Sequence, residues 1–133
     1  MKFLLDTNVY IEAASSVSMW KKFEENIIPL LPFTYLSSVV IFELGLASHF
    51  RDDEKLLRSH IQALEKVRRL VNPSFQDWSA ASQFMHGRKK RSELCDVLIG
   101  CCAKNIGAIL FTFDFKDFLF LSKRIGFKIK RPW

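Results

Sequence analysis

The stretch Lys2-Phe3-Leu4-Leu5-Asp6-Thr7-Asn8 decides the fold, because it joins a strand directly to the start of a helix. Residues 2–5 form a short, mainly apolar run, which is the pattern of a buried strand. Asp, Thr and Asn follow, and these residue types commonly cap the first turn of a helix. Asp6 is therefore expected at the carboxyl end of a buried strand.

The same alternation of strand and helix continues along the chain. Three further strands are predicted over residues 33–36, 108–113 and 127–130, the last as an edge strand. Helices are predicted to start at Ser37–Ser38, running to about residue 50, at Asp52–Asp53, at Pro73–Ser74 and at Ser92. Strands that alternate with helices indicate an α/β fold with a mainly parallel sheet.

Length and composition favour one globular domain over residues 1–133. The chain has 49% hydrophobic and 26% charged residues, and its 133 residues match the usual size of one core. No apolar run reaches the roughly 18 residues that a transmembrane helix needs. The first residues lack the layout of a signal peptide, because Asp6 and Asn8 interrupt the apolar run. We therefore expect a cytoplasmic protein without a membrane partner.

Cysteine and histidine usage argues against a disulfide-rich or zinc protein. Cys95, Cys101 and Cys102 are odd in number, crowd into one segment and contain no CxxC pattern. Free, buried thiols in a reducing compartment are expected. The histidines form no metal-binding pattern and are expected at the surface; they are His49, His60 and His86.

Two acidic residues fall inside apolar helical segments, where an ionised carboxylate is costly unless it is paired or binds a metal. Glu43 lies in the run Val-Val-Ile-Phe-Glu-Leu-Gly-Leu, and Asp96 is followed by Val-Leu-Ile. Neither has a basic residue three or four positions away on its own helix. A partner outside the helix must therefore stabilise each charge.

Two more aspartates, Asp6 and Asp114, follow the two strongest strands, and open α/β sheets place ligands at the carboxyl ends of their strands. Four carboxylates from separate elements are thus predicted to converge. Mg²⁺ or Mn²⁺ prefers oxygen ligands, neutralises such a cluster and suits phosphoryl chemistry. Each residue also has a structural explanation, since Asp6 can cap a helix, Glu43 can reach solvent, Asp96 can favour a helix start and Asp114 can begin a turn.

Four motifs in order resemble the PIN-domain family, and within it most closely a VapC-type toxin ribonuclease. They are Phe-Leu-Leu-Asp6-Thr7-Asn8-Val-Tyr-Ile, Val-Val-Ile-Phe-Glu43-Leu-Gly-Leu-Ala, Cys-Asp96-Val-Leu-Ile-Gly-Cys-Cys-Ala and Leu-Phe-Thr112-Phe-Asp114-Phe-Lys-Asp117-Phe118. In the third motif Gly100 and Cys101 stand where alanine is usual in the family. The resemblance covers residues 3 to about 118.

The resemblance implies a three-layer α/β/α sandwich with a small, mostly parallel central sheet. It also implies that Asp6, Glu43 and Asp96 are metal ligands and that Asp114 is the fourth acid, with Asp117 as its competitor. Glu93, one turn before Asp96, either assists a second metal ion or is a solvated first-turn acid. Thr7, Asn8 and Thr112 either orient a ligand or water, or act as ordinary caps.

The formal net charge of +6 and a sequence pI of about 9.4 favour an anionic partner such as RNA. The predicted RNA-binding residues are Arg88, Lys89, Lys90 and Arg91, just before the Asp96 helix; a solvated loop is the alternative. A second, more diffuse supply of positive charge comes from Lys116, Lys123, Arg124, Lys128, Lys130 and Arg131.

The sequence thus predicts a Mg²⁺-dependent endoribonuclease, with Mn²⁺ as a possible substitute. The resemblance adds that it is the toxin of a toxin–antitoxin pair, forms a homodimer and binds a cognate antitoxin. The alternative is a non-catalytic PIN-like module that binds RNA or acts as a scaffold. A phosphatase-type α/β fold is disfavoured, because it needs a second aspartate where this chain has Asn8.

Overall fold

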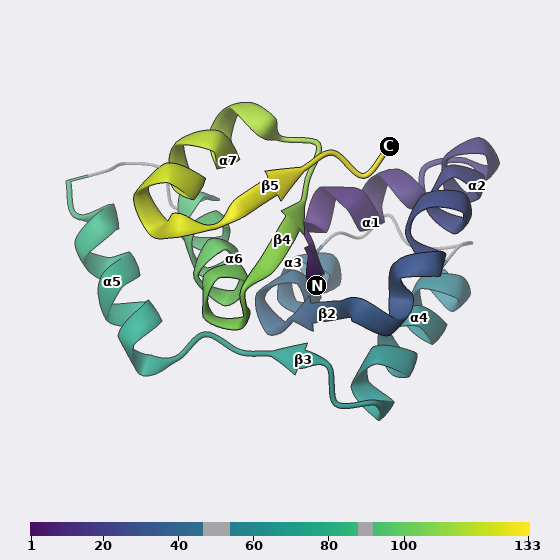
Figure 1. Cartoon of the computed structure of the whole chain (residues 1–133), viewed down its shortest axis with the longest axis horizontal. Helices are drawn as coiled ribbons and strands as arrows, with labels where there is room; N and C mark the ends of the chain where they lie inside the picture. Colours follow the sequence, from purple (N-terminus) through teal and green to yellow (C-terminus); the bar gives the residue numbers. More distant parts are fainter. Residues whose placement is uncertain (47–53, 88–91) are drawn as a thin grey trace.

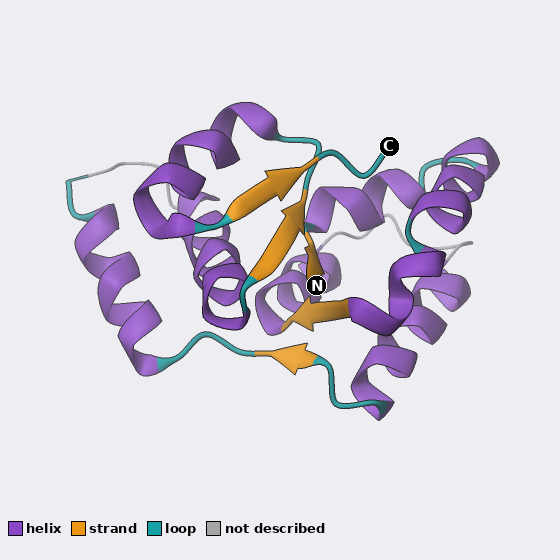
Figure 2. Cartoon of the chain, viewed as in Figure 1, coloured by secondary structure: helices purple, strands orange, loops and turns teal. Residues whose placement is uncertain are grey.

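The computed structural model describes residues 1–46, 54–87 and 92–133. Five strands form one sheet in the order β3-β2-β1-β4-β5, and every pair of neighbouring strands is parallel (Figures 1 and 2). The strands are β1 (Lys2–Leu5), β2 (Thr34–Ser37), β3 (Leu70–Val71), β4 (Ala108–Phe111) and β5 (Lys128–Lys130).

Helices cover both faces of this sheet, which confirms the three-layer α/β/α fold (Figure 2). The α-helices are α1 (Thr7–Ala13), α2 (Val17–Asn26), α3 (Ser38–Leu46), α4 (Glu54–Lys66), α5 (Phe75–Met85), α6 (Ser92–Ile106) and α7 (Phe115–Leu121). A 3₁₀ helix, η1 (Ile28–Phe33), precedes β2, and a π-helical turn, η2 (Ser122–Gly126), continues α7. No helix in the described ranges is long and apolar enough to cross a bilayer.

The position of β1 at the centre of the sheet follows from its sequence. Leu4 and Leu5 are fully buried, as expected for a strand that is covered on both faces. Strand β1 pairs with β4 from Lys2 opposite Ala108 to Leu5 opposite Phe111, so the two strands end side by side. Residues that follow β1 and residues that follow β4 therefore meet at the same edge.

Several sequence predictions agree with these elements and others need correction. The strand over residues 2–5 is confirmed, the edge strand is β5, and Ser37 caps α3 by accepting a hydrogen bond from the Val39 amide at 3.1 Å. The short strand β3 and the helix α7 were not predicted. The predicted strand over 108–113 ends at residue 111; just beyond it the Asp114 amide donates to the Thr112 hydroxyl, and α7 begins at Phe115.

The predicted surface position is wrong for His60, which is only 6% exposed. Its ring packs against Tyr10 and Phe23, with ring centroids 5.5 Å apart in both pairs. Burial lowers the pKa of His60 to about 4. His86 is exposed as predicted, and His49 lies outside the described residues. All three cysteines are free, with Cys101 and Cys102 buried and Cys95 half-buried.

The space around Gly100 explains why this position of the third motif has no side chain in this protein. A Cβ atom at this position would lie 2.6 Å from Cε1 and 2.9 Å from Cζ of the Phe127 ring. We expect Gly100→Val to destabilise the fold by about 1–3 kcal/mol, because overpacking forces the ring or α6 to shift. Chemical unfolding measures this change.

Gly45 provides the control, because it also lies in a helix and a Cβ there meets nothing within 4 Å. Gly45→Ala is expected to be neutral or stabilising by up to about 1 kcal/mol, since alanine has the higher helix propensity. If Gly100→Val unfolds no more easily than Gly45→Ala, the close packing of α6 on Phe127 is not a constraint on the sequence.

Candidate active site

Asp6 sits at the junction of β1 and α1 and caps the helix. Its Oδ1 accepts a hydrogen bond from the Thr7 amide at 2.8 Å, and the side chain is only 4% exposed. Burial raises the pKa of this carboxyl to about 6; hydrogen bonds from Thr112 and Thr7 oppose this shift, and the Glu43 and Asp114 carboxyls add to it. Asp6 is therefore both a structural cap and a poorly solvated acid.

Thr112 ties the end of β4 to the end of β1. Its hydroxyl donates to Oδ2 of Asp6 at 2.9 Å and accepts from the Asp114 amide at 3.0 Å and from Nδ2 of Asn8 at 3.3 Å. Asn8 completes the link, because its Oδ1 accepts from the Phe113 amide at 3.3 Å. The hydroxyl of Thr112, which is fully buried, thus fixes the position of one Asp6 oxygen.

Glu43 reaches the same place from helix α3. Its Oε1 accepts a hydrogen bond from the Thr7 hydroxyl at 2.6 Å. Helix α3 begins directly after β2, so its first turns lie near the carboxyl edge of the sheet. Thr7 therefore bonds to both acids: its amide donates to Asp6 and its hydroxyl donates to Glu43.

Asp96 lies on helix α6, and the pKa of its carboxyl is raised further than that of Asp6. Its pKa rises to about 8, first because the carboxyl is buried and then because other carboxyls repel its charge. The repelling groups are, in order, those of Asp6, Glu43, Asp114 and Asp117. The Asp96 carboxyl therefore lies close enough to these four carboxyls for their charges to raise its pKa.

Asp114 and Asp117 occupy different positions around this cluster. Asp114 is the half-buried N-cap residue of α7, and its carboxyl raises the pKa values of both Asp6 and Asp96. Its own pKa is raised by burial and then by Asp117. Asp117 is exposed, and its charge raises the pKa values of Asp96 and Asp114. Asp114 thus lies deeper in the cluster and Asp117 at its rim.

Glu93 lines a pocket of about 240 Å³ together with Asp96 and Asp117, between α6 and α7. The pocket also contains Lys116 and Phe120. The sequence alone does not single out Phe120, although it follows Lys116 by four residues, as neighbours on one helix face do. The predicted RNA-binding residues Arg88, Lys89, Lys90 and Arg91 lie outside the described residues.

The donor set suits a hard divalent cation, because the groups are carboxylates whose pKa values are raised first by burial and then by neighbouring carboxyls. Within the ranges that the structure describes, no three potential ligands are already arranged as a metal-binding group.

Fold and site together define a parallel α/β protein with an acidic site at the carboxyl edge of its sheet. The family model of the PIN domain matches residues 3–120. The chain therefore belongs to the PIN-domain family, which confirms the family predicted from the four motifs.

Solved structures with the same fold cover nearly the whole chain. A chain of FitAcB from Neisseria gonorrhoeae is 22% identical, with 98% of each chain covered and a TM-score of 0.63. A chain of VapBC-1 from nontypeable Haemophilus influenzae is 23% identical, with 99% of this chain and 98% of that chain covered and a TM-score of 0.63. A chain of VapBC2 from Rickettsia felis, bound to a DNA fragment from the promoter, is 20% identical, with 100% of this chain and 99% of that chain covered and a TM-score of 0.60. A comparison with curated protein sequences gives no match.

Proposed function

We propose that this chain is a Mg²⁺-dependent endoribonuclease and the toxin of a toxin–antitoxin pair. The observation that carries the proposal is the convergence of Asp6, Glu43, Asp96 and Asp114, where burial and mutual repulsion raise the pKa of Asp96 to about 8. Such a cluster is unfavourable unless a cation neutralises it. Family membership and the likeness in fold to VapBC chains support the same activity.

The roles of the side chains follow from their positions. Asp6, Glu43 and Asp96 would hold the ion, with Asp114 as the fourth acid and Asp117 or Glu93 as further ligands at the rim. Bound Mg²⁺ would lower the pKa of an attacking water and stabilise the charge that develops on the phosphate. Thr112 and Thr7 hold the Asp6 and Glu43 oxygens in place through hydrogen bonds of 2.9 and 2.6 Å.

The proposed partners are an RNA substrate, a cognate antitoxin protein and a second copy of the chain, in the cytoplasm. The net charge of +6 supports binding of a polyanion around an acidic site. Arg88, Lys89, Lys90 and Arg91 remain predicted RNA contacts. The antitoxin and the homodimer rest on the resemblance to VapC-type toxins.

A cleavage assay on total RNA tests the proposal. Purified wild-type protein is incubated with Mg²⁺, with Mn²⁺ or with EDTA, and the products are separated by electrophoresis. We expect cleavage with either metal and none with EDTA. RNA that stays intact with both metals, while it still binds the protein, would favour the alternative of a non-catalytic RNA-binding module.

The identity of the fourth ligand can be decided by two matched variants. We expect Asp114→Asn to reduce cleavage more than Asp117→Asn, by about tenfold or more. The reason is that the Asp114 carboxyl is half-buried and raises the pKa values of both Asp6 and Asp96, whereas Asp117 is exposed. Cleavage rates across a Mg²⁺ titration measure the difference. A larger loss in Asp117→Asn would assign the ligand to Asp117 instead.

A further inference from the structure

Two pockets lie on the surface beside the acidic site, along α6 and the continuous α7–η2 helix, and we call them together the groove. Its first part is the pocket of about 240 Å³ that contains Asp96, Lys116 and Phe120. A second pocket, of about 400 Å³, lies further along α6, where η2 and α5 both pack on this helix (Figure 1). Val97, the residue after Asp96, already lines the second pocket, so the two are neighbours.

One side of the groove carries an aromatic residue between two basic ones. Lys116, Phe120 and Arg124 recur every four residues along α7–η2, so they project from roughly the same side of the helix. All three are exposed, Phe120 by 48%. Eight residues of helix span about 12 Å, which matches about three nucleotides of a stacked strand.

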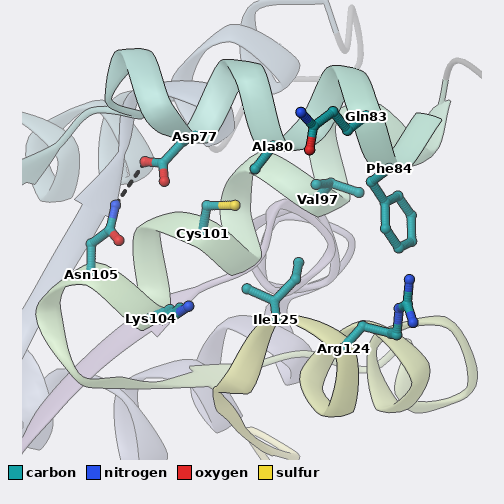
Figure 3. Close-up of a pocket in the computed structure, with 10 residues that line it drawn as sticks. All are labelled: Asp77, Ala80, Gln83, Phe84, Val97, Cys101, Lys104, Asn105, Arg124 and Ile125. Carbon is teal, nitrogen blue, oxygen red and sulfur yellow. Dashed lines mark hydrogen bonds between the residues drawn. The ribbon is translucent and has the colours of Figure 1, made fainter. Parts of the chain in front are cut away.

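Two basic residues, Lys104 and Arg124, are among those that line the far pocket (Figure 3). Lys104 extends from α6, and the guanidinium of Arg124 points toward the Phe84 ring on α5. Among the described residues that line this pocket, Asp77 is the one acid, and it accepts hydrogen bonds from Asn105 at 2.7 Å and from the Ser74 amide at 2.8 Å. Both Asp77 bonds come from within the protein, so this carboxylate is held as part of the α5 N-cap and its contact with α6.

An aromatic pair joins the two pockets. Phe84 lines the far pocket and Phe120 the near one, and their ring centroids lie 6.2 Å apart with an interplanar angle of 50°. Partly exposed aromatic rings beside basic side chains are the elements with which proteins hold single-stranded nucleic acid, because bases stack on the rings and cations contact the phosphates.

We infer that this groove is the binding track for the single-stranded RNA that flanks the scissile phosphate. We define the RNA track as Lys116, Phe120, Phe84, Lys104 and Arg124. A base stacks on Phe120 beside the acidic site, and the next phosphates contact Arg124 and Lys104 in the far pocket. This inference rests on the proposed nuclease function and adds the surface that would hold the RNA beside the cut, since stacking on exposed rings requires unpaired bases.

A binding experiment without cleavage tests the track. A fluorescent, random-sequence single-stranded RNA of about 10 nucleotides is titrated with wild-type protein in EDTA. We expect Phe120→Leu, which keeps an apolar side chain and removes the stacking surface, to weaken binding by about 5- to 150-fold. Phe120→Trp, which keeps a flat ring, is expected to restore it.

The charged residues are tested through the salt dependence of the same binding. We expect the double variant Lys104→Ala, Arg124→Ala to lower the slope of log affinity against log salt by about 0.7 for each phosphate contact that is lost. Lys123→Ala is the matched comparison: Lys123 belongs to the diffuse basic supply but lines neither pocket of the groove, so its loss should change the slope less. Phe75→Leu, at an 82% exposed phenylalanine on α5, is the aromatic control.

The outcomes separate this inference from the proposed function. If wild-type protein cleaves RNA with Mg²⁺ but the track variants bind RNA like Lys123→Ala and Phe75→Leu, the track is wrong and the nuclease assignment stands. The groove would then fit another occupant, such as a polypeptide. If the track variants lose RNA binding while no metal supports cleavage, the track stands and the nuclease assignment fails. Melting temperatures confirm that each variant is folded.

Discussion

Asp96→Asn is expected to abolish RNA cleavage and, at the same time, to raise the melting temperature of the metal-free protein at about pH 8. The loss of activity follows from removing a carboxylate from the proposed metal centre, which we expect to cost several kcal/mol of transition-state stabilisation, or about 10³-fold in rate. The gain in stability follows from removing a charge that burial and neighbouring carboxyls disfavour.

The direction of the pH dependence follows from the pKa of Asp96. Its value is about 8 in the folded protein, against 3.8 for an unperturbed aspartate, so the folded state holds the proton more tightly. The protonated Asp96 carboxyl contributes its full stabilisation of the folded state below pH 3.8, and this contribution is lost as the pH rises through about 8. The difference in melting temperature between Asp96→Asn and wild type should therefore grow from about pH 6 to about pH 9 in EDTA.

Mg²⁺ should reverse the order of stability. An ion that binds only the folded wild type adds about 2.7 kcal/mol at a hundred times its dissociation constant, and Asp96→Asn is expected to gain little. Glu65→Gln on α4 is the control, since Glu65 is exposed and far along the chain from the acidic motifs. If Asp96→Asn is less stable than wild type in EDTA at about pH 8, the side chain has a structural role that outweighs its repulsion.

The sequence was sufficient to predict the elements that carry the acids, because each has a local signal. Residues 2–5 are apolar and end at Asp6, and Glu43 and Asp96 stand out as acids in apolar helices. The carboxyl edge of a parallel sheet then brings them together without any further information. The family match over residues 3–120 agrees with this reasoning.

Features that depend on contacts between distant segments were not predictable. His60 recurs at helical spacing with Leu57 and Leu64, which indicates a packed face. The sequence does not identify its partners Tyr10 and Phe23, which belong to two other helices. The Phe84–Phe120 pair joins α5 to α7, and α7 itself was not predicted. The two-residue strand β3 is too short to give a periodic signal.

Thr112→Val is the second variant for which we expect a large effect, although Thr112 contributes no ligand to the proposed metal centre. The change keeps the shape of the side chain and removes the hydroxyl that donates to Asp6 at 2.9 Å. The Asp114 amide and Asn8 lose their acceptor in the same step. Because these groups are buried or half-buried, we expect a loss of about 1–3 kcal/mol in stability.

Thr112→Val should reduce activity as well as stability, because the lost hydroxyl orients a proposed metal ligand. Hydrogen bonds that orient a metal ligand typically account for 10- to 100-fold in metal affinity or activity, so we expect roughly that loss in cleavage rate at low Mg²⁺. Thr112→Ser keeps the hydroxyl and should restore the rate, since only the methyl group is lost. A Mg²⁺ titration of both variants distinguishes the roles. If Thr112→Ser is as defective as Thr112→Val, packing of the methyl group matters more than the hydrogen bond to Asp6.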